Sequence, residues 1–161
     1  MKDLRSLLNW LEERGQLAHV TKEVDPEYEL VAVAKKINEK YGKAVYFEKV
    51  KGSKYPVVSY VLSSREGIAS SLNMEPHQMT HQWSRREEQQ LPYNIVDDGP
   101  VQEVIEPEPN LYDLPLCIHS DGNNGRYITG GVLIARHPEL GMMNASFNRC
   151  QLVMKRHLES E

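Results

Sequence analysis

Hydrophobic residues near the start of the chain recur at the spacing of one helix face. They are Leu4, Leu7, Leu8 and Leu11. This i, i+3, i+4, i+7 pattern predicts an amphipathic helix, with Asp3 placed to cap its N-terminus and Gly15 placed to end it. The run 16–24 that follows predicts a short strand.

A second helix is predicted directly after that strand. Asp25 suits a capping position, and Pro26 suits the first helical turn, where a missing N–H leaves no bond unmade. Apolar residues at helical spacing mark the face that this helix buries: Leu30, Val31, Ala34 and Ile37. Gly42 predicts its end.

Two apolar runs, 44–50 and 56–62, then predict strands separated by a turn around Gly52 and Ser53.

Two further helices are expected before residue 91. Ser63 and Glu66 have the spacing of a capping box, which predicts a short helix reaching about Leu72. A fourth helix is predicted over 76–90. Helices that alternate with strands indicate an N-terminal α/β domain over residues 1–91.

Proline and glycine become frequent after Leu91, which marks a change in organisation. Residues 92–115 are therefore predicted to form a linker with one short strand at 102–105.

The last part of the chain has a β pattern. The runs 128–136 and 142–154 predict two strands, and the turn between them has Pro138 early and Gly141 at its end, as a hairpin loop requires. A lone hairpin is only marginally stable in water, so these strands are expected to need more sheet. Residues 116–161 are accordingly predicted to be the start of an incomplete second domain.

Charge and cysteine content narrow the functional classes. The net charge of −4 and the pI of about 5.9 give no electrostatic case for nucleic-acid binding. Cys117 and Cys150 lie too far apart for a metal-type pair, and free thiols in a reducing cytosol are the simplest interpretation. No apolar signal-peptide core or membrane span is visible, so a cytoplasmic, soluble protein is expected.

The glycine-rich stretch 120–131 is the first candidate for chemistry. Glycines allow backbone N–H groups to approach an anion closely. The stretch is not a Walker loop, because no Gly-Lys-Ser/Thr follows, and it is not a Rossmann fingerprint, because a strand comes next. A polar loop that simply enters the hairpin explains the same residues.

The second candidate is the stretch 144–149. The amide oxygen of Asn144 suits a hard cation, and the guanidinium of Arg149 suits a carboxylate or phosphate. Five residues of strand reach about 16 Å, which is comparable to the length of a flavin mononucleotide. Positions five apart face opposite sides of a regular strand, so a bulge or bend is required if both residues serve one pocket. A strand edge with polar residues in water is the alternative.

Several short motifs, in this order, resemble the UbiD family of prenylated-FMN (de)carboxylases. The opening stretches 3–5 and 11–15 are similar to that family's usual N-terminus. The later matching motifs are Leu114-Pro115, Asp121-Gly122, Arg126-Tyr127-Ile128-Thr129 and Asn144-x-Ser146-x-x-Arg149. The resemblance implies that residues 116–161 begin a flavin-binding split β-barrel.

The resemblance also implies roles for single residues. Asn144 would be a ligand of the divalent metal, usually Mn²⁺, that bridges the cofactor phosphate, with K⁺ as a second candidate ion. Phe147, Asn148 and Arg149 would run alongside the prenylated flavin. Arg149 would be the arginine of a Glu-Arg-Glu catalytic set and would hold the substrate carboxylate, a two-point contact that lysine cannot reproduce.

The chain departs from the family pattern at two positions and lacks part of the catalytic set. Ser146 and Asn148 stand where the family often has glycine and an aromatic residue, which leaves the substrate subclass open. In the family, the catalytic glutamates and the remaining metal ligands lie beyond residue 161. The chain alone is therefore expected to be inactive.

The function that the resemblance implies is reversible decarboxylation of an aromatic or α,β-unsaturated acid with prenylated FMN. The expected partners are the small carboxylic acid, a flavin prenyltransferase that supplies the cofactor, and further copies of the same chain in a homo-oligomer. Two alternatives stay open: a non-catalytic fragment or subunit that binds flavin or a partner, and a split-barrel flavin reductase.

Overall fold

The computed structural model describes residues 3–89, 92, 94–122, 125–154 and 157–160. It divides into two compact units, each built from three stretches of the chain. Unit 1 comprises Met1–His19, Lys36–Tyr46 and Val58–Glu108, and unit 2 comprises Val20–Lys35, Phe47–Val57 and Pro109–Glu161. The domain boundaries at 91 and 115 that composition suggested stay a prediction.

The first helix and its cap are as predicted. Helix α1 spans Leu4–Glu13, and the Asp3 carboxylate accepts a hydrogen bond from the backbone N–H of Ser6 at 2.8 Å. Gly15 follows the helix with a φ of 63°, a conformation that glycine adopts without strain.

Unit 1 encloses a small core around α1. Leu7 and Leu11 of the helix are buried with Leu17 of strand β1 (Leu17–Val20) and Ala44 of strand β2 (Ala44–Phe47). Partly buried side chains complete the cluster: Leu8, Trp10, Tyr46 and Val61.

A three-stranded sheet has the order β1-β2-β3, with β3 covering Val57–Ser59. Strand β3 is shorter than the predicted run 56–62, because Tyr60 has a φ of 59° and so leaves the extended conformation. The predicted strand 16–24 is likewise reduced to β1, although Val24 still makes a parallel bridge with Val50.

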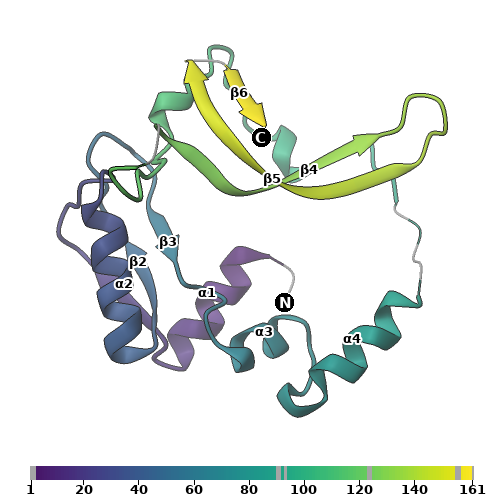
Figure 1. The fold of residues 1–161 in the computed structure, drawn as a ribbon, viewed down its shortest axis with the longest axis horizontal. Coiled ribbons are helices and arrows are strands. Elements are labelled where there is room, and N and C mark those ends of the chain that lie inside the picture. Colours follow the sequence, from purple (N-terminus) through teal and green to yellow (C-terminus); the bar gives the residue numbers. More distant parts are fainter. Residues whose placement is uncertain (1–2, 90–91, 93, 123–124, 155–156, 161) are drawn as a thin grey trace. The chain divides into compact units, whose positions relative to one another are not determined.

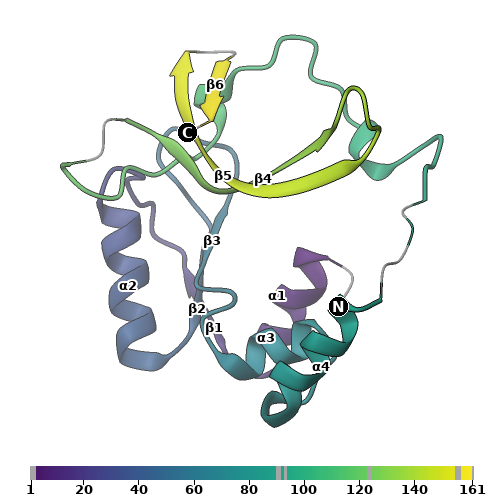
Figure 2. The same ribbon diagram turned by 45° about the vertical axis from the view of Figure 1, so that its right-hand side comes forward.

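Helix α2 spans Glu29–Tyr41, so the expected helix forms but begins later than Pro26. Tyr28 has a φ of 65°, which is incompatible with a helix passing through it. Leu30 and Ala34, from the predicted stripe, are buried. Figures 1 and 2 show the helix as a single straight segment.

Two more helices lie in unit 1. Helix α3 spans Arg65–Ser71, and its N-cap is Ser64, one residue after the predicted Ser63; the Ser64 hydroxyl accepts from the N–H of Gly67 at 2.9 Å. Helix α4 spans Met79–Glu87 and follows a 3₁₀ turn at Pro76–Gln78. Within the described part of the chain, no helix has the length and apolar character needed to cross a membrane.

The strand predicted at 102–105 is wrong. The structure has 3₁₀ turns at Pro100–Gln102 and Leu111–Asp113 instead. Val104 and Ile105 are 85% and 81% exposed, so they lack the covering layer that stabilises an apolar strand.

The hairpin predicted in the last part of the chain forms in unit 2. Strand β4 (Tyr127–Arg136) pairs antiparallel with β5 (Met143–Met154), and both strands curve strongly (Figures 1 and 2). A third strand, β6 (His157–Ser160), pairs antiparallel with β5 and was not predicted. The expected need for more sheet is thus partly met within the chain.

Candidate functional site

A β-bulge lies near the start of β4, where it pairs with β5. Ile128 is opposite Cys150 and Gly131 is opposite Asn148, so two residues of β4 face the single residue Arg149. A bulge increases the local twist of the strands and redirects nearby side chains. The extra residue is on β4, and β5 pairs regularly from Asn144 to Asn148, so this bulge does not bring Asn144 and Arg149 to one face as a shared pocket would require.

Gly131 permits close approach of the two strands at this bulge. A Cβ at position 131 would lie 3.1 Å from the backbone oxygen of Asn148, whereas a Cβ at Gly130 would meet nothing within 4 Å. Of these two glycines, only Gly131 has a steric reason to lack a side chain.

The predicted site residues divide between the two faces of β5. Phe147 and Arg149 share one face, while Asn144 and Asn148 share the other, because side chains alternate along a strand. The Asn148 amide donates to the hydroxyl of Ser146 at 2.8 Å, which fixes its orientation along that second face. The structure thus places Phe147 and Arg149 on one face of β5 and Asn144 on the other.

Arg149 lies against an aromatic ring on the neighbouring strand. Its guanidinium carbon is 4.9 Å from the centre of the Tyr127 ring, within cation–π range. Phe147, on the same face, is 86% exposed. A cationic group and an uncovered aromatic ring on one face can bind a planar conjugated molecule that carries a carboxylate.

A set of ionic contacts holds the start of β4 and was missed by the sequence analysis. Arg126 pairs with Glu27 at 3.3 Å, and Lys51 pairs with Asp25 at 2.7 Å. The hydrogen bond from Lys51 is the main cause that lowers the pKa of the Asp25 carboxyl, followed by the bond from the N–H of Glu27. Glu27 and Arg126 are 99 residues apart, so no local pattern could have joined them.

The turn that carries Glu27 is also fixed by backbone hydrogen bonds. The N–H of Tyr28 donates to the oxygen of Ile118 at 3.0 Å, and the N–H of Ile118 donates to the oxygen of Pro26 at 3.1 Å. The adjacent Cys117 is half-buried, and burial raises the pKa of its thiol, opposed by the charge of Arg126. Both cysteines are free thiols.

The glycine-rich stretch 120–131 leads into β4 as a loop. Gly125 has a φ of 113°, which a residue with a side chain rarely adopts. Asn123 and Asn124 lie outside the described residues. Anion binding by the backbone of this loop stays a prediction.

The donor set for a metal is incomplete in this chain. Among the described residues, no group of three or more His, Cys, Asp or Glu side chains could hold an ion. Asn144 is exposed and its amide oxygen fits a hard cation, so it can serve as one ligand. The other ligands would have to come from outside the described part of the chain.

An apolar pocket of about 360 Å³ lies in unit 1, between α3 and α4. It is lined by Ile68, Leu72, Met79, Thr80 and Trp83. The indole N–H of Trp83 donates to Glu87 at 2.7 Å, and the ring is 48% exposed. The lining is mostly apolar, and Thr80 contributes a hydroxyl to it.

The chain matches the models of two known protein domains. Residues 8–87 match the N-terminal domain of 3-octaprenyl-4-hydroxybenzoate carboxy-lyase, and residues 94–159 match the Rift-related domain of the same enzyme. Together these matches cover most of the chain. The protein belongs to the UbiD family.

Individual relatives agree with this assignment. An uncharacterized protein encoded in the cooM 5′ region of Rhodospirillum rubrum is 38% identical over 97% of this chain and 34% of its own length. Phenolic acid decarboxylase of Sedimentibacter hydroxybenzoicus is 36% identical over 86% of this chain and 31% of its own length. The chain therefore spans about a third of the length of these relatives.

Solved structures show the same fold. An evolved dimeric form of the UbiD-class enzyme HmfF from Pelotomaculum thermopropionicum, in complex with prenylated FMN, is 34% identical with a TM-score of 0.92. The match covers 100% of this chain and 38% of that chain. Vanillic acid decarboxylase of Sedimentibacter hydroxybenzoicus, in its closed form, is 30% identical with a TM-score of 0.89 and covers 100% of this chain and 37% of that chain.

Proposed function

We propose that this chain forms part of an enzyme that reversibly decarboxylates an aromatic or α,β-unsaturated carboxylic acid with prenylated FMN. The observation that carries the proposal is the shared face of β5, on which strand alternation places both the uncovered Phe147 side chain and Arg149. The relatives support it, because two of them are decarboxylases and the structure of one homologue contains prenylated FMN. These relatives make the flavin-reductase alternative the weaker one.

Each predicted site residue has a proposed task that its chemistry suits. Arg149 binds the substrate carboxylate through two parallel N–H donors, and Phe147 packs against the planar part of cofactor or substrate. Asn148 runs alongside the prenylated flavin with its two chain neighbours. Asn144 supplies one oxygen ligand to Mn²⁺, with K⁺ as a second candidate ion. When bound, the prenylated flavin would supply the electron sink for loss of CO₂.

The wider architecture is part of the same proposal. Strands β4 to β6 would be the first strands of a flavin-binding split barrel within residues 116–161. The boundary near 91 is supported by the two family segments, which meet between residues 87 and 94. The apolar residues left exposed on β4 support further strands in the complete protein. A homo-oligomer is supported by the dimeric form described for HmfF.

Two further expectations complete the proposal. The chain alone would be inactive, because none of its residues is proposed to act as the acid or base glutamate of the family. General acid–base catalysis contributes about 10²–10⁴-fold in rate. A flavin prenyltransferase would supply the cofactor. A cytoplasmic location is supported by the two free thiols, Cys117 and Cys150.

Two substitutions in the full-length protein test the proposal. Arg149→Lys keeps the charge but loses the planar two-point contact, so kcat/KM should fall about a hundredfold while flavin stays bound. Asn144→Ala should lower the content of metal and flavin in the purified protein. Arg136→Lys, at an exposed arginine of β4 on the same sheet, is the control and should leave both quantities unchanged.

The outcomes separate the roles. Turnover of Arg149→Lys equal to that of the wild type would remove Arg149 from the catalytic set. Full metal and flavin occupancy in Asn144→Ala would show that Asn144 is an ordinary strand residue.

A further inference from the structure

The register of β4 and β5 explains why Tyr127 meets Arg149. Tyr127 is opposite Gln151, which lies two residues beyond Arg149 and on the same face of β5. Diagonal neighbours on one face of an antiparallel pair are within reach of aromatic and long side chains. The 4.9 Å contact between ring and guanidinium is therefore a consequence of the strand pairing.

An exposed arginine side chain samples many rotamers unless a neighbour restricts it. Arg149 is exposed, whereas Tyr127 is half-buried and so better fixed. A ring held by its strand can restrict the guanidinium to the volume above its face. Tyr127 thus has the geometry of a support for Arg149.

Tyr127 is itself held through its neighbour Arg126. Arg126 directly precedes β4, and its side chain reaches Glu27 while that of Tyr127 reaches Arg149. The backbone oxygen of Arg126 also accepts the N–H of Leu152 at 2.9 Å, which ties this point of the chain to β5.

Glu27, the partner of Arg126, is itself held by several contacts. Its N–H donates to the Asp25 carboxylate at 2.9 Å, and Asp25 is in turn paired with Lys51. Glu27 also forms a parallel bridge with Ile118. These contacts connect the turn at 25–28, residue by residue, to Arg126.

We propose that Tyr127 is a positioning residue for Arg149, and that the Glu27–Arg126 ion pair holds Tyr127 in place. This inference rests on the proposed function, because it assigns Tyr127 the task of orienting the arginine that binds the substrate carboxylate. Tyr127 does not touch the substrate. It acts by limiting where the guanidinium can be.

The first experiment compares Tyr127→Phe with Tyr127→Leu in the full-length protein carrying its flavin. Phenylalanine keeps the aromatic face, so kcat/KM should stay within about twofold of the wild type. Leucine removes it, and kcat/KM should fall about tenfold, less than the hundredfold that a misplacement of about 1 Å can cause. Flavin content should be equal in all three proteins. Equal activity of the leucine and wild-type proteins, or equal losses in both variants, would overturn the proposal.

A double substitution shows whether Tyr127 acts through Arg149. In an Arg149→Lys background, Tyr127→Leu should have at most a small further effect, because the group that it positions has been changed. A further tenfold loss in that background would show an independent, merely structural role and would overturn the proposal.

A readout that does not depend on activity separates this inference from the proposed function. The ring current of Tyr127 should shift the NMR signal of the Arg149 Nε–H upfield, and Tyr127→Leu should abolish that shift. If the shift is absent in the wild type, the positioning contact does not exist. If the shift is present but Arg149→Lys retains full turnover, the contact exists and the proposed role of Arg149 in catalysis is wrong.

The role of the Glu27–Arg126 ion pair is tested by the same NMR measurement. Glu27→Gln should reduce the ring-current shift of Arg149, whereas Glu23→Gln, an exposed glutamate of the same segment, should leave it unchanged. An unchanged shift in Glu27→Gln would remove the ion pair from the proposal.

Discussion

The two phenylalanines of the chain lie in strands that differ in burial. Phe47 ends β2 and is 0% exposed, while Phe147 lies within β5 and is 86% exposed. Two other residues of β2, Ala44 and Val45, are also covered, with 3% and 0% exposed. Strand β2 has completed its packing, and the central part of β5 has not.

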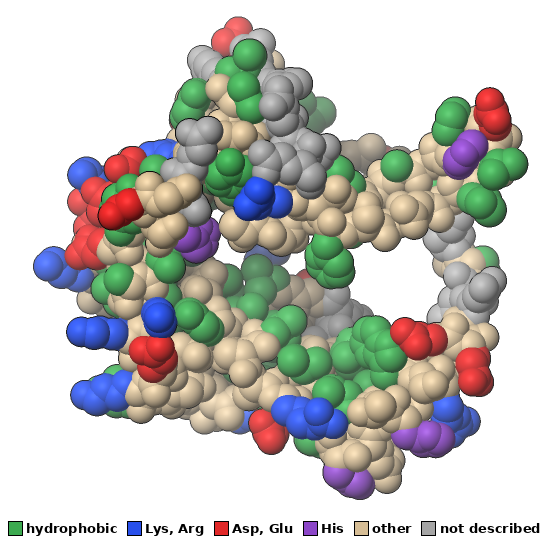
Figure 3. All heavy atoms as spheres, in the orientation of Figure 1, with side chains coloured by type: hydrophobic (Ala, Val, Ile, Leu, Met, Phe, Trp, Pro, Cys, Tyr) green, Lys and Arg blue, Asp and Glu red, His purple; other side chains and the backbone are tan. Residues whose placement is uncertain are grey.

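Exposed apolar side chains lie on both faces of the β4–β5 pair. Adjacent β4 residues on opposite faces, Val132 and Leu133, are 51% and 43% exposed. Figure 3 shows uncovered hydrophobic side chains at the turn that joins the two strands. A strand pair exposed on both faces would gain stability from covering layers. Strand β2 is therefore packed within the described residues, whereas β4 and β5 expose apolar side chains on both faces.

The largest expected effect tests the difference in burial between Phe47 and Phe147. Phe47→Ala should destabilise the protein by about 3–5 kcal/mol, because it removes a fully buried ring and leaves a cavity. Phe147→Ala should change stability by less than about 0.5 kcal/mol, as exposed substitutions do. Urea unfolding followed by circular dichroism measures both. Comparable losses in the two variants would show that the Phe147 ring is covered after all.

The contrast also explains which elements could be predicted from sequence. Helix α1 was predicted from its leucine spacing and from Asp3 because capping and amphipathic packing are local. The strand expected at 102–105 failed because Val104 and Ile105 have no covering layer among the described residues. The cap of α3 fell on Ser64 rather than Ser63, a choice that both serines' chemistry allowed.

The site was less predictable than the helices. The stretch 144–149 was identified from residue types and resemblance, and the need for a bulge followed from strand alternation. The structure has its bulge on β4 instead, and the position of that bulge depends on the pairing between β4 and β5. The contacts of Glu27 with Arg126 and of Tyr127 with Arg149 depend on which strands lie side by side, and no spacing within one segment encodes that.

A smaller effect is expected at the bulge itself, where two adjacent glycines differ. Gly131→Ala would place a methyl group 3.1 Å from the backbone oxygen of Asn148, so the strands must separate by a few tenths of an ångström. We expect a loss of about 1–3 kcal/mol, the range found for overpacking. Gly130→Ala is the matched control, because its Cβ meets nothing within 4 Å. Thermal unfolding of both variants measures the difference, and equal melting temperatures would show that β4 and β5 are loosely paired at this point.

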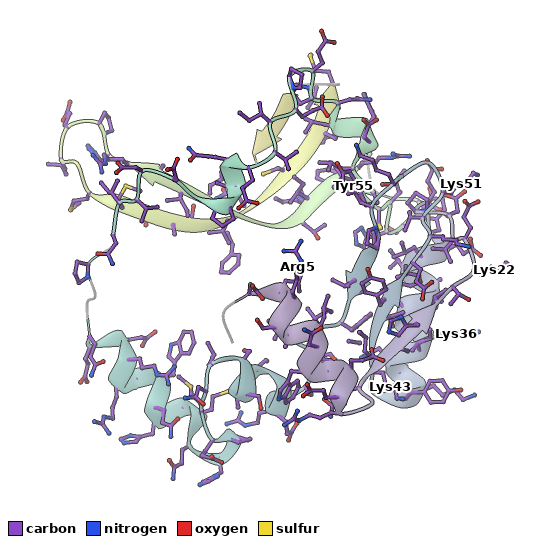
Figure 4. The ribbon with its side chains drawn as sticks, turned by 180° about the vertical axis from the view of Figure 1, so that it is seen from behind. Arg5, Lys22, Lys36, Lys43, Lys51 and Tyr55 are labelled. Atoms are coloured by element: carbon purple, nitrogen blue, oxygen red, sulfur yellow. The ribbon has the colours of Figure 1, made fainter. Side chains whose placement is uncertain are left out.

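The smallest effect concerns the ionic contact that fixes the turn at 25–28. Lys51, labelled in Figure 4, lies 2.7 Å from the Asp25 carboxylate. Their hydrogen bond lowers the pKa of Asp25 below its usual 3.8 and raises that of Lys51 above its usual 10.5. The contribution of Asp25 to stability is therefore present above about pH 4 and is lost as the pH falls through its lowered pKa. That of Lys51 is present below about pH 10 and is lost as the pH rises through its raised pKa.

Lys51→Met should move the Asp25 pKa upward without restoring it fully, because the bond from the Glu27 N–H remains. Lys22→Met is the control, since Lys22 is an exposed lysine of the same unit that is not among the groups shifting Asp25. Carboxyl ¹³C titration by NMR measures the pKa in each variant, and the wild-type protein should lose stability at a lower pH than Lys51→Met does. If Lys51→Met leaves the Asp25 pKa unchanged, the hydrogen bond from Lys51 does not stabilise the Asp25 carboxylate. The turn that carries Glu27 would then be held by the bond from the Glu27 N–H to Asp25 and by the backbone bonds to Ile118.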